Sequence, residues 1–257
     1  MASEPEQFIT VDIQEGVARL TVSRPPLNVL HIALLRQLED ALTDLSANTA
    51  VRALILRAEG KLFSAGVDVA DHTPDRVGEM IPLFDHVCRL LVEFPVPTIA
   101  AVHGHALGGG CELVLCCDLA VIADTAHIGQ PEIQLGAMAP IAALRLPQLV
   151  GYRAAADLLF RGTRIDAAES YRLGIVNAAV PPDEVDEWAQ HKACDLAALS
   201  RAALMLNKQA LRRSFDGWAA SLPAIEQLYL HDLMSTEDAH EGLAAFMEKR
   251  SPVWKHR

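Results

Sequence analysis

The stretch TIAAVHGHALGGGCELVLCC, residues 98–117, joins a buried strand to an apolar helix through three consecutive glycines. The strand is predicted over Thr98–Val102 and the helix over Leu107–Cys117. The first amides of a helix have no intrahelical partners and carry partial positive charge, so they can hold an anion or a developing oxyanion. The alternative is a glycine turn that serves only close helix packing. The spacing of the three glycines matches neither the P-loop nor the dinucleotide fingerprint.

The sequence on both sides of this stretch alternates strands and helices. The segment 53–56 is apolar on both faces, which suits a strand buried in a parallel or mixed sheet. This alternation predicts the α/β class. The predicted elements are strands at 8–13, 17–23, 52–57, 98–102 and 119–123, and helices at 31–46, 74–94 and 107–117, with a hairpin between the first two strands.

Beyond about residue 138 the pattern becomes mainly helical. Neither an internal repeat nor a low-complexity linker divides the chain. We therefore expect one α/β core over residues 1–195, followed by a helical C-terminal region over residues 196–257. The predicted helices of this part are 139–150, 153–160, 167–173, 183–198 and 201–214, with more helix in the long final stretch.

Composition argues against several classes of function. The 257 residues carry a net charge of −11 without a long block of either sign, so the basic footprint of a nucleic-acid-binding protein is missing. The five cysteines are odd in number and lack paired zinc-ligand spacing, which favours buried free thiols in a reducing compartment. Residues 1–6 are polar and acidic, unlike a targeting peptide, and histidines and acids interrupt the most apolar segment, 96–123. We expect a cytoplasmic protein that binds no membrane, nucleic acid or metal.

A second glycine turn and two glutamates are further candidates for chemistry. The segment FSAGVD, residues 63–68, follows a buried strand and can offer a backbone amide where α/β sheets bind ligands, although a plain turn would look the same. Glu112 lies among apolar neighbours, and buried glutamates are rare unless they are paired, functional or placed at a positive helix start. Glu132, within GQPEI at 129–133, would suit a surface loop if it stood alone.

Taken together, these segments resemble the crotonase family of enoyl-CoA hydratases and isomerases. The resemblance rests on AAV at 100–102, GGGCEL at 108–113, CDLA at 117–120, GQPEI at 129–133 and Leu135-Gly136. Upstream, FSAGVDV at 63–69 is similar to the family's oxyanion and CoA-binding turn, and PLNVL at 26–30 to its first CoA-binding loop. The order and spacing of these motifs match those of the family from about residue 8 to residue 180. This match favours a functional role over a purely structural one for the two glycine turns and the two glutamates.

The resemblance implies a spiral of ββα turns with a helical C-terminal region that builds trimers, which in this family often pair into hexamers. It assigns the amides of Val67 and Gly109 to an oxyanion hole for a thioester carbonyl, and Glu112 and Glu132 to acid–base chemistry at the α- and β-carbons. An acyl-CoA thioester would be the substrate, with no metal and no separate cofactor. The implied substrate-binding residues are Leu27, Ser64, Ala65, Gly66, Val67, Asp68, Val69 and Gly109.

One segment departs from the family pattern. Hydratases of the family commonly follow Leu-Gly with a Pro-Gly and glycine-rich turn and then Thr-Gln-Arg, whereas residues 135–147 here are LGAMAPIAALRLP. A glycine-poor, apolar segment would suit a bulky alicyclic acyl group. Together with residues 25–30, 64–69 and His72, it resembles the cyclic dienoyl-CoA (cyclohexa-1,5-diene-1-carbonyl-CoA) hydratases.

Other functions stay open at this point. By resemblance, the presence of both glutamates favours hydration or dehydration over double-bond isomerisation or C–C bond hydrolysis on the same scaffold. A non-catalytic oligomer that binds CoA esters is the third alternative, and it offers no reason for two acids beside an oxyanion hole. His72 follows the second glycine turn and either lines the pocket or has a structural role.

Overall fold

The computed structural model describes residues 6–213 and 217–254 of the chain. Most of the polar N-terminal segment and Ser214, the last residue of one predicted helix, lie outside these residues. Among the described helices, none is both long and apolar enough to cross a membrane.

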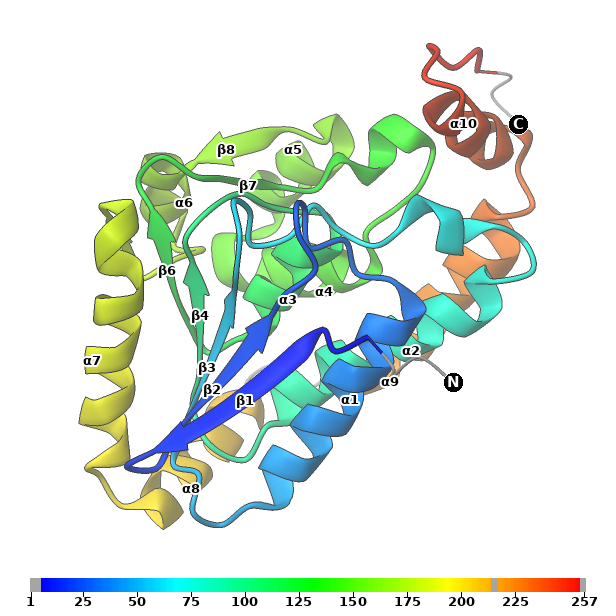
Figure 1. Ribbon diagram of the computed structural model, residues 1–257. Coiled ribbons are helices and arrows are strands. Elements are labelled where there is room, and N and C mark those ends of the chain that lie inside the picture. Colours follow the sequence, from blue (N-terminus) through cyan, green and yellow to red (C-terminus); the bar gives the residue numbers. More distant parts are fainter. Residues whose placement is uncertain (1–5, 214–216, 255–257) are drawn as a thin grey trace.

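The strands of the described residues form two sheets. They are β1 (Ile9–Gln14), β2 (Val17–Val22), β3 (Ala53–Ala58), β4 (Thr98–Val102), β5 (Ala106–Leu107), β6 (Leu119–Ala123), β7 (His127–Gly129), β8 (Arg164–Asp166) and β9 (Ala178–Val180). The large sheet has the order β1-β2-β3-β4-β6-β9 and the small one β5-β7-β8 (Figure 1). β1 and β2 form the predicted antiparallel hairpin, and the other neighbours in the large sheet are parallel.

Helices surround both sheets. The α-helices are α1 (Ile32–Ala47), α2 (Val77–Glu93), α3 (Gly109–Cys116), α4 (Pro140–Val150), α5 (Tyr152–Arg161), α6 (Ala167–Leu173), α7 (Val185–Ala197), α8 (Arg201–Arg213), α9 (Trp218–Gln227) and α10 (Glu237–Met247). Short 3₁₀ helices are η1 (Val69–His72), η2 (Pro131–Leu135) and η3 (Pro182–Glu184), and η4 (Leu228–Leu233) is a π-helix.

The large sheet is covered on both faces. Helix α7 packs on β3, β4 and β6 from one side, and α1, α2 and α3 lie on the other (Figure 1). Burial from two sides explains why residues 53–56 of β3 and 99–102 of β4 are continuous apolar runs rather than alternating ones. Because β3 and β4 are parallel neighbours, the loops that follow them start at the same edge of the sheet, and this edge positions the candidate site.

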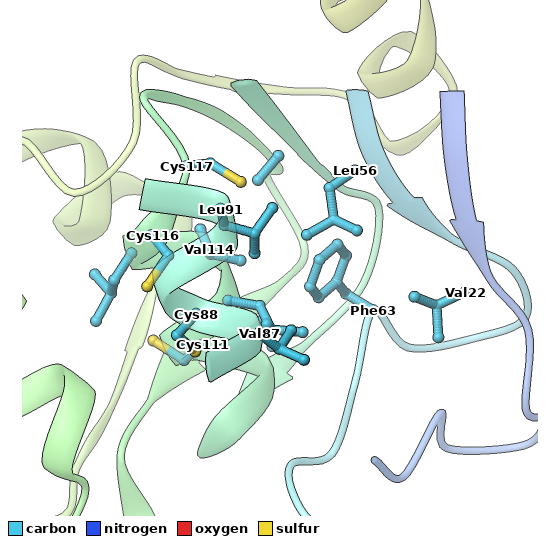
Figure 2. Packing of buried hydrophobic residues seen from close by; sticks show 14 of the residues in the cluster. Val22, Leu56, Phe63, Val87, Cys88, Leu91, Cys111, Val114, Cys116 and Cys117 are labelled. Carbon is cyan, nitrogen blue, oxygen red and sulfur yellow. The ribbon is translucent and has the colours of Figure 1, made fainter. Parts of the chain in front are cut away.

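Four of the five cysteines lie in the core as free thiols, as expected. Cys88 from α2 lies beside Cys111 and Cys116 from α3, and Cys117 directly follows α3 (Figure 2). Cys194 is exposed on α7, so the expectation of burial is wrong there, because its position falls on the outer face of that helix.

An ion pair between a buried lysine and an exposed aspartate ties α8 to the large sheet. Nζ of Lys208, on α8, lies 2.6 Å from Oδ2 of Asp118 and donates to the carbonyl of Val96 at 3.1 Å. The same Asp118 oxygen accepts from the amide and the hydroxyl of Thr98 at 2.8 and 3.0 Å. α9 packs on α2 and α4, and α10 packs on η1 and η2, so the C-terminal helices reach the candidate site.

The predicted strands and helices are confirmed to within a few residues at their ends. The short strands β5, β7, β8 and β9 were absent from the prediction, and β8 and β9 interrupt a part expected to be mainly helical. A strand of two or three residues is too short to establish a two-residue hydrophobic period, so only its tertiary pairing defines it.

Candidate active site

The turn that follows β3 pairs with the loop that follows β2. The amide of Ala65 donates to the carbonyl of Leu27 at 2.9 Å, and the amide of Leu30 donates to the carbonyl of Gly66 at 2.9 Å. The amide of Asp68 in turn donates a hydrogen bond to the carbonyl of Leu30 at 3.0 Å. This pairing holds residues 65–68 in a strand-like path, in which alternate groups point away from the partner loop.

Two buried polar side chains fix the same turn. Asn28, at a positive φ of 49°, donates from Nδ2 to the carbonyls of Glu59 and Leu62 at 2.7 and 2.8 Å. Asparagine tolerates this left-handed region better than most residues. The hydroxyl of Ser64 donates to the carbonyl of Asn28 at 2.8 Å and accepts from the amide of Gly66 at 3.1 Å. The turn is therefore rigidly placed before any ligand arrives.

The backbones of Val67 and Gly109 meet with their amides unused. Among the described residues, neither N–H has a hydrogen-bond acceptor. Gly109 is the first residue of α3, where amides lack intrahelical partners. A Cβ built on Gly66 would lie 3.5 Å from the nitrogen of Gly109, and one built on Gly109 would lie 2.6 Å from Cγ2 of Val67. Glycine is required at 109 for this approach, and two adjacent free amides can bind one oxyanion.

Glu132 lies beside the start of α3. A Cβ built on Gly108 would lie 2.6 Å from Oε1 of Glu132, and Gly108 has a φ of +52°, so glycine suits this position for two reasons. Gln130 is buried, and with its amide nitrogen turned toward Glu132 it donates to both carboxylate oxygens at 3.2 Å. Burial, followed by the negative charge of Glu112, raises the pKa of Glu132 to about 8.

Glu112 lies one turn into α3 and is 3% exposed. Its Oε1 accepts a hydrogen bond of 2.9 Å from the amide of Ala142, in the first turn of α4. Burial raises the pKa of Glu112 to about 7, against the opposing effect of the Ala142 and Ile141 amides. Since free amides at a helix start favour negative charge, α4 moderates a shift that burial alone would make larger.

Both glutamates line one cavity of about 480 Å³ together with Val67 and Gly109. The structure therefore brings together the four residues to which the sequence assigned chemistry. The cavity wall is otherwise mainly apolar, and its apolar side chains come from η1, α2, β5, η2 and α10 and from the loops between them. They include Val69, Met80, Ile81, Phe84, Leu107, Leu135, Met138, Leu243 and Phe246.

The remaining predicted binding residues divide into two groups. Ala65, Gly66 and Val69 line the cavity. Leu27, Ser64 and Asp68 are absent from its lining: Leu27 is 45% exposed, Ser64 is buried beneath the turn, and Asp68 caps η1 by accepting from the amide of Ala70 at 3.1 Å.

His72, whose role the sequence leaves open, lines the cavity. Its Nδ1 lies 3.0 Å from the carbonyl of Asp68, and burial lowers the pKa of the imidazole. Low pKa values favour the neutral ring, so His72 presents an uncharged polar edge to the cavity at neutral pH.

Several residues that shape the site escaped the sequence analysis. Asn28 positions the oxyanion turn, Gln130 contacts Glu132, Ala142 contacts Glu112, and Tyr229 closes part of the wall. Gln130 stands two positions from Glu132 in the sequence and was accessible to inference. Ala142 acts through its backbone and Tyr229 comes from a distant helix, so neither leaves a local signal.

The arrangement supports acid–base chemistry next to an oxyanion. Two carboxyls with raised pKa values can hold one proton between them near neutral pH, which provides an acid and a base together. Within the described part of the chain, no three His, Cys, Asp or Glu side chains are grouped as metal ligands would be.

Comparison with known proteins gives consistent matches over nearly the whole chain. A family model described as enoyl-CoA hydratase/isomerase matches residues 12–257. A probable enoyl-CoA hydratase from Mycobacterium bovis is 36% identical over 98% of this chain and 99% of its own length. A cyclohexa-1,5-dienecarbonyl-CoA hydratase from Thauera aromatica is 38% identical over 94% of each chain. Among solved structures, an enoyl-CoA hydratase/isomerase from Pseudoalteromonas atlantica superposes with a TM-score of 0.88 at 27% identity, covering 96% of this chain and 100% of the other.

Proposed function

Since the chain belongs to the enoyl-CoA hydratase/isomerase family, the crotonases, we propose that it adds water to, or removes water from, the α,β double bond of an acyl-CoA thioester. The observation that carries this proposal is the meeting of Glu112 and Glu132 in one cavity beside the unused amides of Val67 and Gly109. Hydration needs a base for water, an acid for carbon and a site for developing negative charge. These four groups supply all three.

In the hydration direction, the thioester oxygen accepts hydrogen bonds from the amides of Val67 and Gly109. One glutamate, as a carboxylate, takes a proton from water while the water oxygen bonds to the β-carbon. The electrons of the double bond move toward the thioester oxygen, and the other glutamate, as a carboxylic acid, gives its proton to the α-carbon. Each amide is worth a few kcal/mol by analogy with known oxyanion holes, and each carboxyl a factor of roughly a hundred or more.

The CoA part of the thioester would lie along the residues 64–69 and the loop around Leu27. Support comes from the pairing of these two segments, which places Leu27 at the surface next to the turn that carries the oxyanion amide. The acyl part would occupy the apolar cavity. No metal or additional cofactor takes part in the proposed reaction.

A bulky, alicyclic acyl group is the proposed substrate class. The segment 135–147, which lacks the glycines usual in the family, supplies Ala137, Met138 and Pro140 to the cavity wall. The printed name of the Thauera aromatica relative, a cyclohexa-1,5-dienecarbonyl-CoA hydratase, supports the same proposal.

We further propose that residues 196–257, as a helical region appended to a 1–195 core, build a homotrimer or a dimer of trimers. Large apolar side chains of this region that remain exposed on a single chain support this proposal: Leu199, Leu206, Leu228 and Met247. Light scattering coupled to gel filtration tests it, and a monomer at micromolar concentration would contradict it.

The proposed reaction is tested with a panel of linear and alicyclic enoyl-CoA thioesters in water labelled with oxygen-18. We expect the label to appear in a hydroxyacyl-CoA product detected by mass spectrometry. An unlabelled double-bond isomer as the sole product would show an isomerase instead. Binding without any turnover across the panel would support a non-catalytic CoA-ester-binding protein.

A further inference from the structure

The cavity wall contains a buried hydroxyl without a partner. Tyr229 is 1% exposed, lines the cavity, and its hydroxyl has no hydrogen-bond partner among the described residues. It is carried by the π-helix η4, in which the amide of Met234 bonds to the carbonyl of Tyr229 at 3.0 Å. π-Helical turns are rare and occur frequently at functional sites. The turn therefore places a polar residue within a wall that is otherwise mainly apolar.

The described residues include a second buried polar side chain without a hydrogen-bond partner. Asp85, on α2 next to the cavity-lining Phe84, is 1% exposed, and neither of its carboxyl oxygens has a hydrogen-bond partner among the described residues. Its neighbours include Glu112 and Glu226, and after burial the charge of Glu112 is the largest cause that raises the pKa of Asp85, to about 9. Burial raises the pKa of the Tyr229 hydroxyl, and the charges of Glu132, Glu112 and Asp85 add to this effect.

Leaving a buried hydroxyl unsatisfied costs about 1–3 kcal/mol, and such groups are uncommon in native proteins. A phenylalanine at 229 would fill the same space without that cost. The hydroxyl thus indicates a polar ligand group that satisfies it when the cavity is occupied. Such a group belongs to whatever fills the cavity, which under the proposed function is the acyl chain.

We propose that the Tyr229 hydroxyl forms a hydrogen bond with a neutral polar substituent, a hydroxyl or a carbonyl, on the acyl part of the substrate. This inference rests on the proposed function only in that the cavity holds an acyl group. Tyr229 is then a specificity-determining residue, which favours oxygenated acyl groups over pure hydrocarbons of the same shape.

The charges around Tyr229 indicate that the recognised group is neutral. Asp85, Glu112 and Glu132 all act on Tyr229, and each is an acid whose pKa is raised. An environment that opposes ionisation of its own carboxyls also opposes an anionic substituent on the ligand. Arg164 lines the same cavity but is exposed on β8. A terminal carboxylate is therefore expected to weaken binding.

Binding of saturated thioesters, which cannot react, tests the inference separately from catalysis. The probes are cyclohexanecarbonyl-CoA, its 3- and 4-hydroxy and 4-carboxy derivatives, and the linear pair hexanoyl-CoA and 6-hydroxyhexanoyl-CoA, measured by calorimetry. We expect at least one hydroxylated probe to bind roughly five-fold more tightly than its parent, because one hydrogen bond contributes about 1 kcal/mol. The carboxylated probe should bind more weakly than the parent.

The variant Tyr229→Phe should abolish this preference while it leaves binding of the parent thioesters unchanged or tighter. Tyr152→Phe, the same change at an exposed site, is the matched control. Equal affinity of every hydroxylated probe and its parent in the unmodified protein would overturn the inference, even if the variant did not fold. Equal weakening of all probes by Tyr229→Phe would overturn it too, because that pattern means a merely structural role.

Failure of the proposed function gives a different pattern. Preference for a hydroxylated thioester without any hydration of enoyl-CoA substrates would contradict the hydratase and leave the inference standing. Failure to bind any of the thioesters would overturn both.

Discussion

The amide of Ala142 donates a 2.9 Å hydrogen bond to Oε1 of Glu112, and so joins the start of α4 to a carboxyl buried in α3. This bond connects the segment that departs most from the family pattern with one of the two proposed catalytic acids. The glycine-poor segment therefore does more than shape the cavity. It also sets the electrostatic environment of Glu112, because amides at a helix start favour the charged carboxylate.

Replacing Glu132 by glutamine should lower turnover by about two to four orders of magnitude, because the amide can neither accept nor donate the transferred proton. Affinity for a saturated acyl-CoA should stay within a few-fold, since the oxyanion amides and the cavity are unchanged. Steady-state kinetics and calorimetry measure the two effects. Glu187→Gln, at an exposed position on α7, should behave as the unmodified protein. Turnover by Glu132→Gln within three-fold of normal would contradict the acid–base role.

The stability difference between Glu112→Gln and the unmodified protein should depend on pH. Burial raises the pKa of Glu112 to about 7, whereas an unfolded glutamate has a pKa near ~4.3. The folded state thus binds this proton more tightly, so the associated stability is complete below pH ~4.3 and is lost as the pH rises through 7. Glutamine does not ionise, so the Glu112→Gln variant has no such pH-dependent loss of stability.

Between pH 5 and pH 8.5, the free energy of unfolding of Glu112→Gln should therefore rise relative to the unmodified protein by up to about 3 kcal/mol. Urea unfolding at both pH values measures this change. Glu187→Gln should follow the unmodified protein at each pH. A constant difference, or one of opposite sign, would mean that Glu112 is not held in the folded state with a raised pKa.

The amide of Gly109 can be removed by proline, which is tolerated at the first position of a helix. A side chain at 109 would meet Cγ2 of Val67 at 2.6 Å, so the substitution is best made together with Val67→Ala. The double variant Val67→Ala/Gly109→Pro should lose a factor of 10²–10³ in kcat relative to Val67→Ala/Gly109→Ala, which keeps the amide. Equal kcat values in the two folded double variants would remove the amide of Gly109 from the proposed mechanism.

Asp118→Asn should destabilise the fold by about 1–3 kcal/mol, because it leaves the buried ammonium of Lys208 without its anionic partner. Adding Lys208→Met should recover part of this loss, since the uncompensated buried charge is then gone. Lys61→Met, at an exposed position, is the control and should change the free energy of unfolding little. Urea denaturation of the four proteins gives the comparison. If the single Asp118→Asn variant were as stable as the control, the ion pair would not anchor α8 to the large sheet.

Much of this fold was predictable because its longer elements carry their own periodicity. α1 buries leucines at three- and four-residue steps, and β3 and β4 are apolar on both faces because helices cover both. The candidate residues were also accessible, since glycines and isolated acids in apolar runs are local features. Their resemblance to a family motif supplied the pairing of Glu112 with Glu132, which lie twenty positions apart.

The sequence by itself determined the α/β class and the order of the long elements, and its resemblance to a family motif supplied the four residues proposed for chemistry. Their signals are local: a hydrophobic period or a glycine at a turn can be recognised without knowing what lies across the molecule. Only the tertiary structure decided that the amide of Ala142 donates to Glu112 and that Asn28 bonds to the segment leading into the oxyanion turn. The position of Tyr229 in the cavity wall was likewise decided by the tertiary structure alone. These contacts join segments far apart in the chain through backbone groups or single side chains, and no local pattern encodes such a meeting.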